Sequence, residues 1–324
     1  MNWHFLTPAL IALIGGLPTF PFSARAECRH PVAVGAWNIN WLGRPDMRSA
    51  DAKGVAQRPS DLAAFIASAD VQVLGLMEII PDVGRETNAT LDATFATLNR
   101  DGAAWRYRLF PSRRRGYEDQ MLTGLAWDEA QLMALGEPFK AVHQDTEPAF
   151  GWDRGVTAMK FARRGGADFV LMVVHMKANV PSRPIPGSAP PPPPAQRTIE
   201  AATLVGELPA VRRAFEDRDL VILGDMNVLS RTEEAMKIFR LDGFVDLNST
   251  DLPTTVVTIP PGATNPRWPP APFDRVLVPE YQPEFRESQM SVLGPSPEQA
   301  ATFSRTLSDH ALIRFTLCAS VDDD

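Results

Sequence analysis

The chain has 324 residues, 44% of them hydrophobic and 22% charged, so it can bury one large core. Its formal net charge of -7 excludes a general attraction to polyanions, and a polyanionic partner would need a local basic patch. No shift in composition divides the chain into two domains, and no internal repeat is evident.

The first 26 residues have the pattern of a signal peptide. An apolar stretch at 6–17 is too short and too broken to span a bilayer securely, and the small-x-small sequence Ala24-Arg25-Ala26 follows it. No Lys or Arg precedes the stretch, so a start site chosen too far upstream and an uncleaved anchor both stay open as alternatives. We expect cleavage before Glu27, a single domain at 27–324, and a secreted or periplasmic protein with a formal charge of -8.

The six strand-like segments of the chain all carry polar side chains at one end. In chain order, the segments are 32–42, 71–79, 169–177, 220–223, 273–278 and 311–315. The side chains at their ends are, in the same order, Asn38 and Asn40, Glu78, His175 with Lys177, Asp225 with Asn227, Asp274, and Ser308-Asp309-His310. Helix-like stretches at 60–69 and 197–216 alternate with the strands. Polar groups beside buried strands must face a cleft or be satisfied internally.

Each polar residue has an ordinary explanation when taken alone. His175 could be a satisfied core or edge histidine, and the two asparagines of the first segment, which we expect on one strand face, could make turn or strand-end hydrogen bonds. Asp225 and Asn227 could form a helix N-cap or an Asx-turn. Glu78 is a lone carboxylate in an apolar strand, which is costly unless it is paired or bound to a metal. One functional cleft would account for all of these placements.

The motifs WNIN, ME, VVHMK, GDMN, FDRV and SDH, in this order, resemble those of the endonuclease/exonuclease/phosphatase superfamily. This superfamily contains DNase I-like nucleases, abasic-site endonucleases, sphingomyelinases and inositol polyphosphate phosphatases. The resemblance runs from about residue 32 to residue 316. Met77 stands where the family usually has Gln, and Asn40 stands where several members carry an acid. The resemblance implies an α/β (α+β) fold, a four-layer sandwich of two mixed β-sheets packed face to face with helices outside.

A divalent metal site is the first functional expectation. Phosphodiester hydrolysis must neutralise charge that develops on the phosphoryl oxygens, and a hard cation with oxygen ligands suits this task. Glu78 and Asp309, joined by the amide oxygen of Asn38 or of Asn40, are candidate ligands for Mg2+ or Mn2+. Asn40 would be the weaker ligand because it lacks the acid of several family members. No His/Cys cluster has the spacing of a zinc site.

The resemblance also implies roles for the remaining polar residues. Asp225 would orient or deprotonate the attacking water, and Asn227 would help to hold this water or a phosphate oxygen. His310 would contact the scissile phosphate, with its ring oriented by Asp274. His175 would be the second imidazole, which either protonates the leaving group or donates a hydrogen bond to the phosphate.

Candidate substrate contacts come from arginines. Arg154 resembles the family arginine that reaches phosphate, and a surface salt bridge is its alternative. The segment 106–115, RYRLFPSRRR, has five arginines, and Arg113, Arg114 and Arg115 are its most concentrated charge. It is the best candidate for binding a phosphate backbone, although a solvated loop is equally open.

Two proline-rich stretches flank the motifs. Residues 181–196 read as a polyproline II-like loop, which could shape substrate access or serve as a spacer. In the stretch 259–272, Trp268 could stack on a base or a lipid headgroup, or pack on its own loop.

The two cysteines, Cys28 and Cys318, lie at opposite ends of the mature chain. In an oxidising compartment, a disulfide between them would join the first and last strands. Two buried free thiols are the alternative.

The sequence therefore predicts an exported, divalent-metal-dependent phosphodiesterase, with DNA or RNA as the favoured substrate. A phosphomonoesterase or a sphingomyelinase-like phospholipase on the same fold is the enzymatic alternative. No exposed aromatic hairpin or amphipathic helix is evident, so we expect no stable membrane association. A non-catalytic binding protein would require a broken site, and the polar set looks intact.

Overall fold

The computed structural model describes residues 28, 30–49, 52–100, 102–110, 121–143, 152, 154–182, 189–259, 264–266 and 268–319. The expected signal peptide at 1–26 and the arginines Arg113, Arg114 and Arg115 lie outside the described residues.

The first six-stranded sheet contains both the first and the last described strands. Its order is β11-β12-β1-β2-β4-β3. The strands are β1 (Pro31–Leu42), β2 (Val73–Ile79), β3 (Trp105–Phe110), β4 (Leu122–Asp128), β11 (Ser291–Leu293) and β12 (Leu312–Cys318). β1 is parallel to β2 and antiparallel to β12, so the two ends of the domain meet in the middle of this sheet.

The second six-stranded sheet has the order β5-β6-β7-β8-β10-β9. Its strands are β5 (Leu132–Val142), β6 (Val156–Arg163), β7 (Asp168–His175), β8 (Leu220–Asp225), β9 (Phe244–Asp246) and β10 (Asp274–Pro279). β7 and β8 are parallel, whereas β10 runs antiparallel to β8. The carboxyl ends of β7 and β8 therefore lie beside the start of β10.

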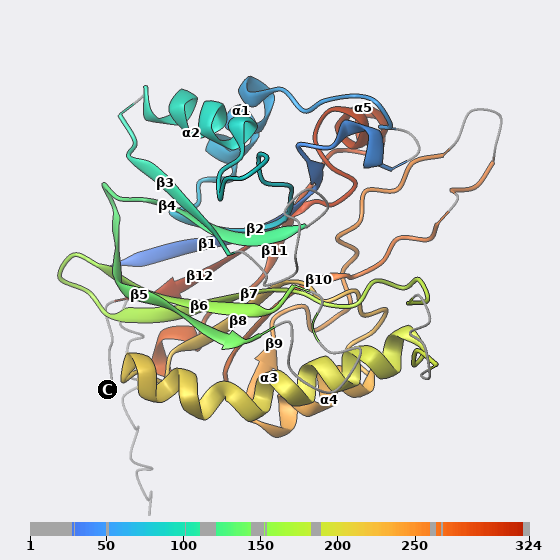
Figure 1. The fold of residues 1–324 in the computed structure, drawn as a ribbon. Helices are drawn as coiled ribbons and strands as arrows, with labels where there is room; N and C mark the ends of the chain where they lie inside the picture. The colour runs from blue at the N-terminus through green and yellow to red at the C-terminus, as the bar shows by residue number, and fades with distance from the viewer. Residues whose placement is uncertain are drawn as a thin grey trace, which may run out of the picture.

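Helices cover the outer face of each sheet, and the two sheets pack face to face between them (Figure 1). On the first sheet lie α1 (Pro59–Ala69), α2 (Ala89–Asn99) and α5 (Ala300–Thr306), and on the second lie α3 (Pro193–Phe215) and α4 (Glu234–Leu241). Two short 3-10 helices span Pro45–Met47 and Pro283–Phe285. The predicted four-layer sandwich of two mixed sheets is confirmed.

The layers explain why the central strands are almost continuously apolar. On β7, Phe169, Leu171 and Val173 join the core between the two sheets. The alternate residues, such as Val170 and Met172, join the core beneath α3 and α4. Because side chains alternate across a strand and both faces of this strand are covered, every position from 169 to 174 is buried.

The helix α3 begins four residues earlier than the sequence indicates. Residues 193–196 were expected in the extended loop, but Pro193 and Pro194 occupy the first turn of the helix. Proline is tolerated there because the first helical N–H groups have no partner within the helix. The polyproline II-like assignment is therefore wrong for 193–196.

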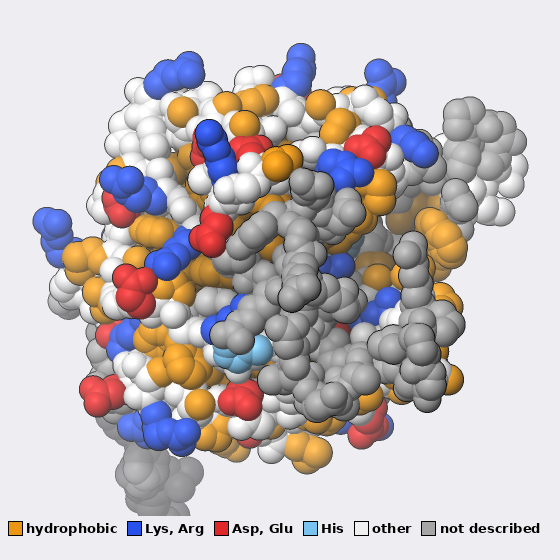
Figure 2. Space-filling model, in the orientation of Figure 1, with side chains coloured by type: hydrophobic (Ala, Val, Ile, Leu, Met, Phe, Trp, Pro, Cys, Tyr) orange, Lys and Arg blue, Asp and Glu red, His pale blue; other side chains and the backbone are white. Residues whose placement is uncertain are grey.

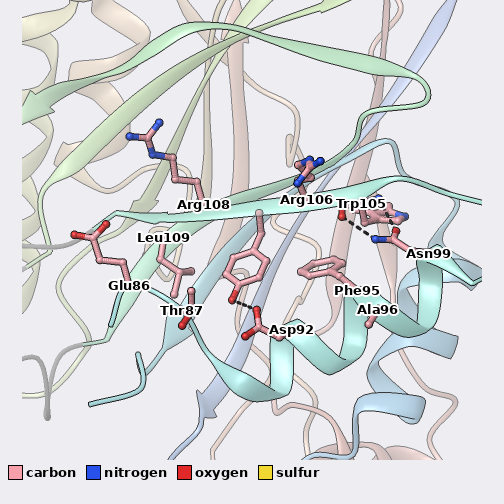
Figure 3. A pocket seen from close by; sticks show the side chains of 11 residues that line it. Glu86, Thr87, Asp92, Phe95, Ala96, Asn99, Trp105, Arg106, Arg108 and Leu109 are labelled. Carbon is pink, nitrogen blue, oxygen red and sulfur yellow. Dashed lines mark hydrogen bonds between the residues drawn. The ribbon is translucent and has the colours of Figure 1, made fainter. Parts of the chain in front are cut away.

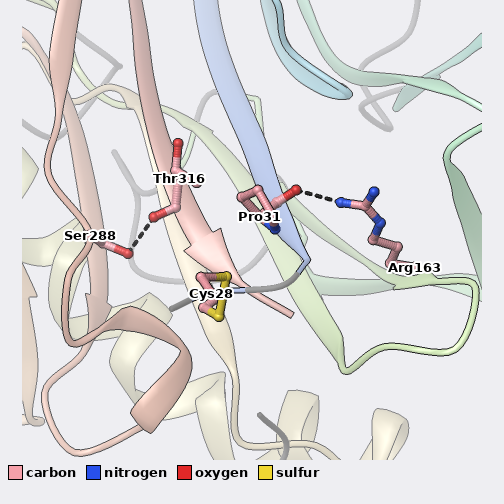
Figure 4. Close-up of a disulfide and its surroundings, with 6 residues drawn as sticks. Cys28, Pro31, Arg163, Ser288 and Thr316 are labelled. Atoms are coloured by element: carbon pink, nitrogen blue, oxygen red, sulfur yellow. Dashed lines mark hydrogen bonds between the residues drawn. A yellow bond between two sulfur atoms is a disulfide. The ribbon is translucent and has the colours of Figure 1, made fainter. Parts of the chain in front are cut away.

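A disulfide links Cys28 to Cys318, with their Cα atoms 5.6 Å apart (Figure 4). It lies where β1 begins and β12 ends, next to the pairing of Pro31 with Cys318. The Pro31 carbonyl also accepts a hydrogen bond of 2.6 Å from Arg163. The disulfide is consistent with an extracellular or periplasmic location. Among the described residues, no helix has both the length and the apolar character needed to cross a membrane.

We expect reduction of this disulfide to lower the free energy of unfolding by up to about 5 kcal/mol, because it closes a loop of nearly the whole domain. Thermal unfolding with and without reductant measures the effect. The double variant Cys28→Ser/Cys318→Ser is the control, and its Tm should not respond to reductant. An equal response of both proteins would show that the disulfide does not stabilise the fold.

Candidate active site

The strand register brings three of the polar residues together at one edge of the second sheet. His175 pairs with Asp225 across β7 and β8, and Asp274 pairs with Asp225 across β8 and β10. In the first sheet, Asn38 on β1 pairs with Met77, the residue before Glu78 on β2. Because the sheets pack face to face, these two edges meet.

Asn38 links the two edges directly. Its Nδ2 atom donates hydrogen bonds of 3.1 Å to Glu78 Oε1 and of 3.1 Å to Asp225 Oδ2. His175 Nε2 lies 3.7 Å from Glu78 Oε1 and 3.5 Å from Asp225 Oδ2. Glu78, His175 and Asp225, together called the acidic group below, have ligand atoms that all lie within 4.8 Å of one another, a spacing that could hold a metal ion.

A bulge in β1 gives this corner its shape. The register between β1 and β2 shifts between Asn38 and Leu42, and Asn40, Trp41 and Glu78 adopt positive φ angles of 50°, 55° and 60°. The bulge lets the Trp41 N–H donate to Glu78 Oε2 at 3.0 Å. Non-glycine residues rarely adopt this conformation, which costs on the order of 1–3 kcal/mol each and occurs often at functional sites.

The bulge also separates the two asparagines. Asn38 contacts the carboxylates, whereas the Asn40 side chain donates to Ser49 at 3.1 Å. The expectation that both amides serve one strand face fails because the two-residue alternation of a strand ends at the bulge. The structure does not bring the Asn40 amide nitrogen to the acidic group.

Gly224 permits the close approach of β8 to its neighbours. Its φ angle is 136°, and a Cβ atom there would lie 2.2 Å from the Val174 carbonyl oxygen. The next residue, Asp225, donates its N–H to the Met77 sulfur at 3.0 Å. Met77, which stands in place of the family's usual Gln, therefore joins the two sheets beneath the site.

Asn227 follows in a left-handed conformation with a φ angle of 53°. Its N–H donates to Asp225 Oδ1 at 2.9 Å, and its Nδ2 donates to the Met176 carbonyl at 3.2 Å. This is the Asx-turn that the GDMN motif suggests, and it fixes one oxygen of Asp225 so that the other faces the site.

His310 and Asp274 form a buried pair, with His310 Nδ1 2.8 Å from Asp274 Oδ2. The same carboxylate oxygen accepts a hydrogen bond of 2.7 Å from Thr254. The other ring nitrogen, His310 Nε2, lies 3.9 Å from Asp225 Oδ2. The pair orients the ring so that Nε2 faces the acidic group.

Two residues without an assigned role hold this histidine in position. Ser308 donates to the Asn38 carbonyl at 2.6 Å and accepts from the His310 N–H at 3.0 Å. Thr254 belongs to no motif, and the sequence carries no signal for it. Ser308 could have been found from its place in the SDH motif.

Arg154 and Asp309 lie at the margin of the site. The Arg154 guanidinium donates to the His175 carbonyl at 3.3 Å and to the Met121 sulfur at 3.3 Å. It is close enough to lower the pKa values of Glu78 and His175, though burial is the dominant influence on both. Asp309 lies near enough to raise the pKa of Glu78 further.

Burial and charge separate the proton affinities of these groups. Burial raises the pKa of Asp225 to about 7, and the neighbouring acids add to the rise while His310 opposes it. Burial lowers the pKa of His175 well below its usual value, helped by Arg154 and His310. Burial also opposes a charged His310, but Asp274 and the other carboxylates raise its pKa well above the usual value. At neutral pH, the His175 imidazole is therefore neutral and the His310 imidazole is charged.

The donor set fits a divalent cation. Two carboxylates and a neutral imidazole supply oxygen and nitrogen ligands, and burial penalises both carboxylates in their charged forms. A cation at this position would neutralise them.

A sequence model described as the Endonuclease/Exonuclease/phosphatase family matches residues 35–314. The chain belongs to this family. Members of the family are metal-dependent hydrolases of phosphoester bonds, and this protein is an enzyme of the same type. No curated protein compared with the chain matches it.

Solved structures with the same fold have low sequence identity to this family member. The mannosyl-6-phosphatase of Bacteroides thetaiotaomicron has 16% identity and a TM-score of 0.57, over 88% of this chain and 99% of that one. The human Nocturnin catalytic domain, with a bound sulfate anion, has 17% identity and a TM-score of 0.53, over 89% of this chain and 94% of that one. Truncated TDP2 of Caenorhabditis elegans has 15% identity and a TM-score of 0.54, over 89% of this chain and 98% of that one. At these identities, the likeness supports the fold alone.

The arginine-rich segment is described only in part. Arg106 pairs with Glu129 at 2.6 Å, and Arg108 pairs with Glu137 at 3.0 Å. On the face shown in Figure 2, basic and acidic side chains are interspersed over the described surface. The two described arginines therefore form exposed ion pairs, and any basic patch depends on the remaining three.

A groove of about 440 Å³ between α2 and β3 lies apart from the candidate active site (Figure 3). Phe95, Trp105 and Tyr107 line it, and the Tyr107 hydroxyl is bonded to Asp92 at 2.5 Å. None of its lining residues belongs to the acidic group or to the His310–Asp274 pair.

We expect Asp274→Asn to lower the pKa of His310 and to reduce turnover roughly 100-fold, because the ring loses the carboxylate that favours its charged form. A pH titration of the His310 ring by NMR on the metal-free protein measures the shift. Thr254→Val is the matched control, since it removes a hydrogen bond to Asp274 but keeps the charge, and its shift should be smaller. An unchanged titration in Asp274→Asn would contradict the pairing.

Cation affinity should rise between about pH 6 and pH 8, because Asp225, with a pKa of about 7, adds its negative charge beside the cation only after it has lost its proton. Mn2+ binding followed by electron paramagnetic resonance at each pH measures this dependence. Glu78→Gln should lose at least roughly tenfold in affinity, whereas Glu86→Gln, on the exposed surface, should not. Equal affinities at both ends of the pH range would contradict the role of Asp225.

Proposed function

We propose that this enzyme is an exported, Mg2+- or Mn2+-dependent phosphodiesterase whose substrate is a nucleic acid, DNA or RNA. The observation that supports phosphoester chemistry most directly is the buried His310–Asp274 pair facing the acidic group of Glu78, His175 and Asp225. In this proposal, the pair supplies a proton donor close to a carboxylate base and to a cation site.

In this proposal, Glu78 would hold the cation, with Asn38 and Asp309 in its surroundings, and Asp225 lies beside it. A bound cation would neutralise the charge that develops on the phosphoryl oxygens. The carboxylate oxygens of Glu78 and Asp225 favour Mg2+ or Mn2+, whereas the Asn38 amide faces them with its Nδ2 because its Oδ1 accepts the Asn40 N–H at 3.0 Å.

Asp225 is the proposed base for the attacking water, since the Asx-turn with Asn227 leaves Oδ2 facing the site. His310 is the proposed donor to the phosphate, because its pKa is raised and its Nε2 faces the same carboxylate. The lowered pKa of His175 favours a neutral ring, so we assign leaving-group protonation to His310 and not to His175.

The choice of a nucleic acid rests on the segment that carries Arg113, Arg114 and Arg115. Met121, the first described residue after this segment, accepts a hydrogen bond from Arg154 at the margin of the site. Five residues lie between Arg115 and Met121 in the sequence. Three adjacent arginines are the most concentrated positive charge in the sequence, and such a run favours a polyanionic substrate.

A phosphomonoester and a phospholipid are the alternative substrates. Trp268 is 71% exposed and Ile259 is 57% exposed, and both belong to the segment between β9 and β10, where an aromatic or aliphatic side chain could meet a base or a lipid. Export is supported by the apolar N-terminal stretch and by the disulfide.

The deciding experiment compares hydrolysis of plasmid DNA, RNA, sphingomyelin and a phosphomonoester by residues 27–324, with Mg2+ or Mn2+ and then with EDTA. We expect cation-dependent cleavage of nucleic acid that EDTA removes and that His310→Ala lowers by at least roughly 100-fold. Substitution of Arg113, Arg114 and Arg115 by Gln should reduce the salt dependence of nucleic acid binding.

Activity on the lipid or the monoester alone would refute the nucleic acid substrate, but the protein would still be a phosphoester hydrolase. Nucleic acid cleavage by His310→Ala at the wild-type rate would refute the assignment of His310.

A further inference from the structure

Arg197 is a buried arginine on α3 that contacts the loop after β7 and the loop after β8. Its side chain is fully buried. Among the described residues, the hydrogen bonds and the ion pair of Arg197 involve none of the groups assigned to hydrolysis. A charge buried in this way is costly unless it is well paired, so its partners indicate what it stabilises.

The first set of partners lies on the loop after β7. Arg197 Nη1 donates to the Lys177 carbonyl at 3.0 Å and to Asn179 Oδ1 at 3.0 Å. With its oxygen engaged by the guanidinium, the Asn179 amide presents its Nδ2 to the Asn227 carbonyl, at 2.8 Å. Arg197 therefore reaches Asn227 through one intervening side chain.

The second set of partners lies after β8. Arg197 Nε and Nη2 donate to Glu233 Oε2, at 3.2 and 2.8 Å. The other oxygen, Glu233 Oε1, accepts the Leu229 N–H at 2.6 Å. Through Asn179 and Glu233, one guanidinium holds the backbone on both sides of Val228.

The loop held in this way begins at the proposed catalytic base. Asn227 adopts a left-handed conformation with a φ angle of 53°, and its N–H fixes Asp225 Oδ1. Such a conformation persists only where the surroundings enforce it. Released from these contacts, residues 227–229 could relax, and Asp225 would lose its fixed orientation.

We propose that Arg197 is a positioning residue that holds Asn227 and Asp225 in the geometry required for hydrolysis. A guanidinium suits this role because its rigid fork serves several acceptors at once, which a lysine ammonium cannot do in the same geometry. The proposal rests on the hydrolase site and is independent of whether the substrate is a nucleic acid.

The test uses two variants and one matched control. Arg197→Met removes the guanidinium and keeps much of the side-chain volume. Asn179→Ala removes only the link to Asn227, at an exposed position where folding should tolerate the change. The control is Arg212→Met on the same helix, since Arg212 pairs with Asp242 at 3.5 Å and lies fifteen residues further on, roughly 22 Å along the axis.

The first readout needs neither substrate nor cation. Hydrogen exchange of the peptide 226–231 should be faster in Arg197→Met than in the wild type, because the Leu229 N–H loses its fixed acceptor. In Arg212→Met, this peptide should exchange at the wild-type rate. Equal protection of the peptide in Arg197→Met and in the wild type would overturn the proposal.

The second readout is the division between kcat and KM per folded molecule, on an aryl phosphodiester or on whichever substrate the comparison above identifies. We expect kcat to fall roughly tenfold to 100-fold in Arg197→Met and less in Asn179→Ala, with KM within about twofold, because the loss is of orientation. Arg212→Met should keep the wild-type kcat. A merely structural role would lower Tm and leave kcat per folded molecule unchanged in both arginine variants.

If Arg197→Met does not fold, Asn179→Ala decides the question. A wild-type kcat in that variant would overturn the link from Arg197 to Asn227, and a reduced kcat at unchanged Tm would support it. Absence of nuclease activity would overturn the proposed substrate alone, because the exchange measurement does not depend on substrate.

Discussion

The close contact between the two sheets beneath the acidic group is the constraint on which the site depends. Gly224 lacks a side chain where a Cβ atom would lie 2.9 Å from the Met77 sulfur, and that sulfur accepts the Asp225 N–H. Gly75 meets Val173 in the same layer, with a contact of 3.1 Å at the position a Cβ atom would take. Because the sheets approach this closely, Asn38 from one sheet can bond carboxylates from both. Larger side chains at the two glycines would push the halves of the site apart.

The electrostatics of the site follow from the same contact. Carboxylates brought together and removed from water raise one another's pKa values, and the two imidazoles respond in opposite directions according to their neighbours. Asp274 accepts a hydrogen bond from one ring nitrogen of His310, whereas His175 Nδ1 is buried without a hydrogen-bond partner among the residues that the structure describes. Similar residues thus acquire different protonation states from their positions in the fold, which is how one site can hold both an acid and a base.

The layers can be predicted from the resemblance of the motifs to the family, and the polar ends of the strands indicate most of the residues that meet at the site. Long apolar runs such as that of β7 indicate strands covered on both faces, and the polar residues at their ends mark the edge where the sheets meet. The bulge after Asn38 could not be predicted, because a two-residue period does not reveal where a strand departs from it. Arg197 was also not recognised, since a charged residue in an expected helix usually faces water. Its burial depends on loops that are distant in sequence.

The placement of β1 and β12 side by side has a consequence for how the chain folds. Each of these strands forms part of the centre of the first sheet, and the cysteines beside them are 290 residues apart in sequence. Contacts between such distant residues must overcome a large loop-closure entropy, and they slow folding. The first sheet cannot be completed until β12 has been synthesised. Until then, the edge of β1 that pairs with β12 has no hydrogen-bonding partner strand. Order of synthesis and order of assembly therefore differ in this protein, and the strand made first is among the last to be fully paired.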